Sequence, residues 1–332
     1  MGHRCGERGV LFAMKKKGSP PSIRGHKSLV TSIWNSTEPL VSVIIPVQNE
    51  RDRIEGVIWN ARMIHPSTEV IVVANGTTDG SHQVAERMGA KVLYYPYVLG
   101  HDVGRSVGSQ QARGEILLFL DGDLPLPFRL LRPFVKAVMD GADLALNGFV
   151  APDQRRRVHP VVLSKYALNI ILNRPDLKGA SMTAVPHALN RRALLEIGHE
   201  NLSVPPKALA IAIEQGLRIE TIANIPIERW NRKRGKRPWM RELVVGDHLE
   251  AIHWFLQRKG NRGGYWDGMR VREAVFMPAD QEGEIMTVHG EGRMGEEERI
   301  GEREIINRGE FDPTISVEKE TESEDALNVN LE

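Results

Sequence analysis

The chain has 332 residues, 41% of them hydrophobic, which is enough to bury one sizeable core without disulfide or metal staples. Its 44 basic and 43 acidic residues give a formal net charge of +1, which argues against a dedicated nucleic-acid-binding protein, since such proteins are usually strongly basic. Cys5 is the single cysteine, which excludes a disulfide framework and a cysteine-based zinc site.

The small net charge hides three zones of different composition. Residues 1–39 carry seven basic and two acidic residues and are rich in Gly, Pro and Ser, which predicts a flexible basic arm. Residues 40–271 carry 31 basic and 23 acidic residues, a net charge of +8, and hold the regular hydrophobic patterns. Residues 272–332 carry six basic and 18 acidic residues, which predicts a mostly disordered acidic tail.

Apolar runs and helical spacing alternate over the first half of the middle zone. Residues 41–45 are an apolar, β-branched run with Ser42 as its one polar residue, and the run ends at Pro46, which is typical of a strand buried on both faces. The same criteria predict strands at 70–73, 91–95, 115–120 and 142–147, and helices at 49–64, 80–88, 103–112 and 127–139. This alternation predicts an α/β fold: a mostly parallel, Rossmann-like sheet with helices on both faces and ligands bound beyond the carboxyl ends of the strands.

Two carboxylates follow the strand predicted at 115–120. Asp121 and Asp123 leave an extended strand at positions i and i+2, so their side chains project to the same side. Such a pair repels unless a cation lies between the carboxylates, and hard oxygen ligands suit Mg²⁺ or Mn²⁺ shared with substrate phosphates. An ordinary Asp-Gly turn at a strand end is the alternative interpretation.

Residues 75–81 form a polar loop after the strand predicted at 70–73. The loop begins Asn75-Gly76 and contains Asp79-Gly80, which are standard turn residues. Two interpretations remain open: a loop that hydrogen-bonds a nucleobase or ribose, or a turn in which Asp79 caps the next helix.

Three strand-end segments, 41–50, 72–81 and 113–123, together resemble the family 2 glycosyltransferases with the GT-A fold in order, spacing and strand context. The resemblance covers roughly residues 40–255 and is strongest over 40–150. It implies a nucleotide-diphosphate-sugar donor and a divalent metal, Mn²⁺ or Mg²⁺. It also implies a nucleotide-sugar-binding half at 40–150 and an acceptor half with a C-terminal helix at 151–271.

The resemblance assigns roles to the residues that match the family pattern. It implies that Asp121 and Asp123 hold the metal, with Asp123 the direct catalytic ligand. It implies that the remaining matched residues bind the nucleotide sugar together with Asp121; these are Pro46, Asn49, Glu50, Asn75, Asp79 and Arg105. Many family members have two acids where this chain has Ala74-Asn75, so we do not assign the nucleotide.

The family's general base has no counterpart in this chain. Many inverting members carry a Glu-Asp pair in the acceptor half, where this chain has Pro205-Pro206, and neither proline accepts a proton. Nearby candidates for the base are His187, His199 and Glu200; a neutral imidazole can serve as a base near pH 7. Each of the three can equally be a hydrogen-bonded or exposed polar residue.

Residues 229–241 contain seven Lys or Arg residues interleaved with Trp230 and Trp239. The first interpretation is contact with the donor diphosphate or with the acceptor through Arg229, Arg232 and Arg234. The alternatives are a patch for anionic lipid or a lipid-phosphate acceptor, an RNA-binding segment, and a solvated basic loop. Its place after the strand predicted at 219–225 favours the diphosphate or acceptor interpretation.

An amphipathic helix is predicted at 243–256, with Leu249, Ile252 and Leu256 on its apolar face. His248 and His253 lie within it. The resemblance allows His248 to complete the metal shell, because a histidine near the C-terminus does so in some GT-A enzymes; a packed or solvated histidine is the alternative.

We therefore expect a metal-assisted glycosyltransferase of the hexosyltransferase type, with inversion favoured by the resemblance, acting in cell-envelope, polysaccharide or glycolipid synthesis. Its expected partners are the sugar donor and a sugar, lipid-phosphate or other hydroxyl acceptor, with no nucleic acid.

No apolar run reaches the roughly 20 residues that cross a bilayer, so we expect a soluble cytoplasmic protein that can sit peripherally at the inner face of the membrane. The alternative function is a non-catalytic nucleotide-sugar-binding or interaction protein of the same fold. A Rossmann dehydrogenase is disfavoured because no G-x-G-x-x-G follows the first strand.

Overall fold

The computed structural model describes residues 34–148, 158–227, 230 and 238–276. The chain divides into two units, Met1–Arg270 and Val271–Glu332, and the fold reported below belongs to the first. Within the described ranges, no helix combines the length and the hydrophobicity that crossing a bilayer requires.

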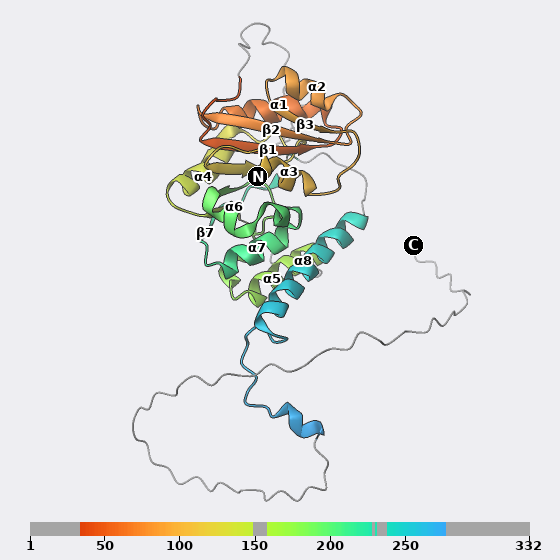
Figure 1. Ribbon diagram of the computed structural model, residues 1–332, viewed down its shortest axis with the longest axis vertical. Coiled ribbons are helices and arrows are strands. Elements are labelled where there is room, and N and C mark those ends of the chain that lie inside the picture. The colour runs from red at the N-terminus through yellow and green to blue at the C-terminus, as the bar shows by residue number, and fades with distance from the viewer. Residues whose placement is uncertain (1–33, 149–157, 228–229, 231–237, 277–332) are drawn as a thin grey trace, which may run out of the picture. The chain divides into compact units, whose positions relative to one another are not determined.

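The described part of the first unit is built on a seven-stranded mixed sheet (Figure 1). The strand order is β3-β2-β1-β4-β6-β5-β7. Only β6 runs antiparallel to its neighbours, β4 and β5; the other pairings in these residues are parallel. The strands are β1 Val41–Val47, β2 Thr68–Asn75, β3 Lys91–Tyr95, β4 Ile116–Phe119, β5 Leu144–Asn147, β6 His187–Asn190 and β7 Ile219–Ala223. The expected α/β, mostly parallel fold is confirmed.

Helices cover both faces of this sheet. The four predicted in the first half are present within a few residues of their expected ends; they are α1 Arg51–Arg62, α2 Ser81–Arg87, α3 Val103–Gln110 and α4 Phe128–Met139. The second half adds α5 Pro160–Ile171, α6 Arg191–Ile197, α7 Pro205–Glu214 and α8 Pro238–Lys259, with short 3₁₀ turns η1 Pro175–Leu177 and η2 His199–Ser203. The second unit contains one short 3₁₀ turn among its described residues, η4 Arg272–Phe276.

The buried run of β1 explains the two-sided core. Val43 and Ile45 pack into one hydrophobic cluster with α1 and α4, whereas Ile44 packs into a second cluster with α6 and α7. Successive strand residues point to opposite faces, so a strand covered on both sides is mainly apolar on both; its one polar residue, Ser42, is fully buried and donates to Glu69 Oε1 at 2.6 Å. The apolar run read from the sequence is therefore a direct consequence of this layering.

A third apolar layer lies beyond α7. Leu168 of α5, Ala210 of α7, and Ala251 and Phe255 of α8 form a separate buried cluster. Leu249 was predicted to lie on the apolar face of α8, and this prediction is wrong, because Leu249 is 61% exposed. The helix packs instead through Ala251 and Phe255.

Helix α3 lies unusually close to the sheet because of two glycines one turn apart. A Cβ on Gly108 would lie 2.5 Å from Ile44 Cγ2 and 3.2 Å from Val73 Cγ2, and one on Gly104 would lie 3.0 Å from the Pro46 Cβ. These contacts leave no room for a side chain, so the glycines set the distance between α3 and β1. This distance positions the residues of α3 that face the candidate site.

We expect Gly108→Ala to lower the free energy of unfolding by about 1–3 kcal/mol, because the added methyl group overpacks the core against Ile44. Gly246 provides a matched control: it is also helical, in α8, and a Cβ there meets nothing within 4 Å. Gly246→Ala should stabilise by up to about 1 kcal/mol through helix propensity. Urea unfolding of both variants measures the two effects, and equal effects would contradict the close packing of α3.

Candidate functional site

A cleft of about 520 Å³ opens at the carboxyl ends of β1, β2 and β4. The three polar segments predicted to meet at this rim do meet there. The lining residues are Pro46, Val47, Gln48 and Glu50 after β1, Asn75 of β2, Val98, Gly100, His101, Asp102 and Arg105 around the start of α3, Asp121, Gly122 and Asp123 after β4, and Trp239, Met240 and Leu243 of α8.

Asn75 ties the end of β2 to the wall of the cleft formed by residues 98–102. Its side-chain nitrogen donates to the Gly100 carbonyl at 2.9 Å, and its oxygen accepts from the Leu99 amide. The side chain is nearly buried, at 8% exposure. Asn75 therefore shapes the cleft as well as lining it.

Asn49 and Asp79 are not among the described residues that line the cleft; they fasten the first two loops to each other. Asn49 lies in the left-handed region at φ 57, and its Oδ1 accepts from the Thr78 amide at 2.8 Å. Asp79 Oδ2 accepts from the Arg51 amide at 2.9 Å, and Asp79 Oδ1 accepts from the Ser81 amide at 2.9 Å. Partial burial raises the pKa of Asp79, but these hydrogen bonds outweigh it and hold the pKa below its usual value. The N-cap position of α2 is Gly80, so Asp79 bonds the first residue of the helix from one position before the cap.

Arg105 lies beneath the carboxylates of the cleft. Its Nη1 contacts Asp102 Oδ1 at 3.0 Å and donates to the Met182 carbonyl at 3.2 Å, and its Nη2 contacts Asp121 Oδ1 at 3.3 Å. The side chain is only 4% exposed. Burial lowers the pKa of Arg105, but the negative charges of Asp102 and Asp121 raise it by more than burial lowers it. The guanidinium therefore stays charged. Arg105 thus fixes the Asp121 carboxylate.

Asp102 is a site residue that sequence reasoning missed. It lies at φ 62 immediately before α3, and its side chain is 3% exposed between Arg105 and His101. The sequence contains the i,i+3 spacing to Arg105, but this spacing does not by itself show the pair to be buried.

Arg53 is a second missed residue, and it joins two distant segments at the rim. Its Nη1 donates to the carbonyls of Asp123 and Trp230, each at 2.9 Å. Arg53 lies in α1, so this one side chain links the Asp123 loop to the chain after β7. Three basic residues predicted to contact the diphosphate or acceptor, Arg229, Arg232 and Arg234, lie outside the described residues.

The donor set at Asp121 and Asp123 fits a hard divalent cation that substrate oxygens also bind. The Asp121 side chain is 42% exposed, and both Asp121 and Asp123 line the cleft. Gly122 has no room for a Cβ, which would lie 3.0 Å from the Pro46 carbonyl oxygen. In the part of the chain that the structure describes, no group of three or more His, Cys, Asp or Glu side chains could hold a metal. Mg²⁺ is commonly bound by one or two carboxylates, with substrate phosphates completing its coordination.

His248 does not form a three-residue ligand group with Asp121 and Asp123 in the described residues. It is 1% exposed within α8, and its Nδ1 donates to the Val244 carbonyl at 2.6 Å. Its Nε2 is buried without a hydrogen-bond partner. Burial lowers the pKa of His248 to about 4, so the ring is neutral near pH 7.

The three candidates for the general base lie outside the cleft lining of the described chain. His187 stacks on Phe119, with ring centroids 4.9 Å apart, and its Nδ1 donates to the Ala184 carbonyl at 2.9 Å. Burial and the charge of Arg105 lower the pKa of His187 to about 3, which makes it a weak base at neutral pH. His199 packs behind α3, with its Nδ1 2.7 Å from Ser109 Oγ, and Glu200 is its neighbour in η2. Pro205 and Pro206 are buried in the first turn of α7.

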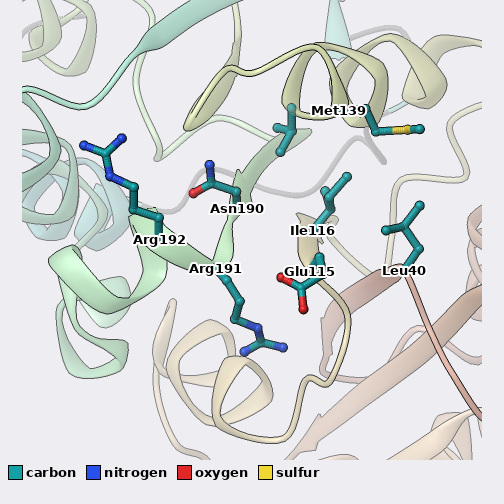
Figure 2. A pocket seen from close by; sticks show the side chains of 8 residues that line it. Leu40, Glu115, Ile116, Met139, Asn190, Arg191 and Arg192 are labelled. Carbon is teal, nitrogen blue, oxygen red and sulfur yellow. The ribbon is translucent and has the colours of Figure 1, made fainter.

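A second hollow lies at the amino end of β4, away from the Asp121 end of the strand. It measures about 570 Å³, and Figure 2 shows Arg191 and Arg192 pointing to opposite sides of it. Arg191 Nη2 is already held by the Ala112 and Gly114 carbonyls, each at 2.7 Å. Asp121 and Asp123 are not among its lining residues, so we place the candidate site in the cleft.

Comparisons with known proteins identify the matching family. Residues 42–198 match the family model described as glycosyl transferase family 2. The chain is 39% identical over 97 residues to glycosyltransferase AglE of Haloferax volcanii, which covers 26% of this chain and 32% of that protein. It is 27% identical over 115 residues to an undecaprenyl-phosphate 4-deoxy-4-formamido-L-arabinose transferase of Pseudomonas fluorescens, covering 31% and 34%. The chain thus spans about a third of the length of these curated relatives.

The fold also matches a solved structure. It is similar to glucosyl-3-phosphoglycerate synthase from Mycobacterium tuberculosis, crystallised with Mn²⁺, uridine diphosphate and phosphoglyceric acid. The TM-score is 0.50 at 20% sequence identity, and the match covers 69% of this chain and 80% of that one. At this sequence identity the match supports a similar fold and no more.

Proposed function

Residues 42–198 of this chain are a glycosyl transferase family 2 domain, and from this premise we propose that the protein moves a sugar from a nucleotide-diphosphate sugar to an acceptor hydroxyl. The observation that carries the proposal is the cleft itself. It brings Asp121 and Asp123 together with Pro46, Glu50 and Asn75, as a donor site at the strand ends requires.

In the proposed reaction the acceptor hydroxyl attacks the anomeric carbon and the nucleoside diphosphate departs. Asp121 and Asp123 would hold Mn²⁺ or Mg²⁺, which when bound neutralises negative charge on the diphosphate. The M. tuberculosis neighbour, crystallised with Mn²⁺ and uridine diphosphate, supports this choice of ions. Arg105 keeps the Asp121 carboxylate in place through its 3.3 Å contact, so the residue acts by positioning.

The acceptor side of the proposed site is apolar. Trp239, Met240 and Leu243 of α8 line the cleft, and Trp239 and Leu243 remain 53% and 38% exposed. This wall favours an acceptor with an apolar portion, such as a lipid phosphate, and one relative is named for transfer involving undecaprenyl-phosphate. Inversion, and the cytoplasmic location of the reaction, stay predictions from the family resemblance.

The test is donor binding to the full chain. We expect one of UDP-, GDP- or dTDP-sugars to raise the melting temperature in the presence of Mn²⁺, because a ligand that binds the folded state stabilises it by RT ln(1 + [L]/Kd). EDTA should abolish the shift, and incubation with an acceptor should release the nucleoside diphosphate. Binding without turnover would favour the alternative, a non-catalytic nucleotide-sugar-binding protein; no binding of any donor would overturn both.

A further inference from the structure

Helix α5 is mostly apolar but poorly buried. Eight of its 12 residues are hydrophobic, yet its buried residues are Leu168 and Asn169. Leu163 and Ile170 are 61% and 55% exposed. They are seven positions apart, about two helical turns, so they lie on the same side of the helix. This side of α5 is an apolar surface with nothing from the described chain covering it.

The loop that follows α8, residues 260–270, extends this surface, and we call it the aromatic loop. Figure 1 shows α5 and α8 side by side at the end of the described fold away from β1–β3. Tyr265 donates its hydroxyl to the Ile170 carbonyl at 2.8 Å, which joins the loop to the C-terminal end of α5. Trp266 and Met269 of the loop are 76% and 85% exposed. Leu163 and Ile170 of α5 and Trp266 and Met269 of the loop are thus exposed apolar residues of two segments that this hydrogen bond joins.

The aromatic loop has a defined conformation held from inside. Arg262 donates to the carbonyls of Tyr265 and Trp266, at 3.1 and 2.6 Å, and its Nη1 contacts Asp267 Oδ1 at 3.0 Å. Arg270 Nε donates to the Asp267 carbonyl at 2.9 Å. Gly263, at φ 59, lies against the Phe255 ring, where a Cβ would lie 3.1 Å from Cε1. These contacts use the polar groups of the loop internally, so the side chains of Trp266 and Met269 point outward.

Positive charge surrounds the apolar side chains. Residues 254–270 contain one acidic residue, Asp267, and four basic residues: Arg258, Lys259, Arg262 and Arg270. Lys259 pairs with Glu214 of α7 at 2.9 Å, and Arg262 and Arg270 pair with Asp267. The formal net charge of residues 254–270 is +3. Aromatic residues and cations at one surface are the composition found at membrane–water interfaces with anionic lipids.

We propose that α5 and the aromatic loop bind the surface of an anionic lipid bilayer, with Trp266 and Met269 entering the interface and the net positive charge of residues 254–270 attracting the headgroups. A second copy of this chain fits the surface less well. In a two-fold dimer the same patch meets itself, so the +3 segments of both copies would face each other. The proposal goes beyond the proposed reaction and does not depend on it.

The experiment is sedimentation of the full chain with vesicles. We expect binding to phosphatidylcholine–phosphatidylglycerol vesicles that weakens in high salt, and little binding to phosphatidylcholine alone. Trp266→Ser/Met269→Ser should bind at least about tenfold more weakly, because two apolar side chains no longer enter the interface. Arg258→Glu should weaken binding through charge alone. Leu195→Ser is the control, since Leu195 is 76% exposed on α6, outside this surface.

Three results would overturn the proposal. They are absence of wild-type binding to the anionic vesicles, equal binding by Trp266→Ser/Met269→Ser, and sedimentation velocity showing a dimer that these substitutions dissolve. Donor binding by the same variants should equal that of the wild type. If the wild type binds anionic vesicles but none of the donors, the proposed function is contradicted and this inference stands.

Discussion

Asp123→Ala is expected to remove sugar transfer almost completely while leaving the protein folded. Asp123 lines the cleft on a loop that Gly122 keeps close to β1, and its backbone carbonyl, which Arg53 holds at 2.9 Å, survives the substitution. A lost metal ligand costs several kcal/mol of transition-state stabilisation, and about 4 kcal/mol corresponds to a rate loss of about 10³-fold. The measurement is release of nucleoside diphosphate at saturating Mn²⁺, with the circular dichroism spectrum as the check on folding.

Two further variants sharpen this expectation. Asp123→Asn keeps the shape of the side chain and removes its charge, so it should be nearly as inactive as the alanine variant. Asp140→Ala is the matched control, because Asp140 is an exposed carboxylate at the end of α4 that pairs with Lys136. If Asp123→Ala keeps full activity, Asp123 is neither a metal ligand nor a catalytic residue.

Arg105→Ala is expected to cause the largest loss of stability, about 3–5 kcal/mol, because it leaves a buried carboxylate without its cation. The Asp102 side chain is 3% exposed and would keep the His101 ring, 3.4 Å away, as its neighbour. Asp121 would lose its 3.3 Å contact, so donor affinity should fall as well. Urea unfolding measures the stability, and donor binding is measured at a temperature where the variant is folded.

Companion variants separate the buried charge from simple packing. Arg105→Lys should recover little, since an ammonium cannot reproduce the fork that contacts Asp102, Asp121 and the Met182 carbonyl. Arg105→Met combined with Asp102→Asn should recover most of the stability and not the donor affinity, because no buried charge is left unpaired. Arg87→Ala, an exposed arginine of α2, should change stability by less than about 0.5 kcal/mol. If Arg105→Ala and Arg87→Ala behave alike, the buried ion pair does not have the role assigned to it.

The first half of the fold followed from the sequence because its signals are local. The run at 41–45 is apolar at every position except Ser42, and burial of a strand on both faces favours such a run. Strand β6 gave no such signal: its four residues, beginning at His187, form a strand because they pair antiparallel with both β4 and β5. Helices α5, α6 and α7 were not predicted either, since their boundaries depend on packing in the second half.

The candidate site divides in the same way. Asp121 and Asp123 could be placed from their spacing after a strand, because parallel strands bring their carboxyl ends to one edge. Asn49 and Asp79 were assigned to the nucleotide by resemblance, whereas their hydrogen bonds join two loops. Arg53 acts through partners distant in the sequence, which no local pattern reveals; Asp102 pairs with Arg105 at i,i+3, a spacing that the sequence contains but that does not by itself show the pair to be buried.

Strand β7 has a consequence for anyone who truncates this protein. The family match ends at residue 198, but β7, at Ile219–Ala223, pairs with β5 and begins 21 residues later. A fragment cut at the end of the match would leave the backbone of β5 unpaired at an open sheet edge, which invites aggregation. It would also lose the Trp230 carbonyl that Arg53 binds, and the α7 side chains that complete the second core cluster. The smallest fragment expected to express as a stable, monomeric protein therefore extends well past the residues that identify its family.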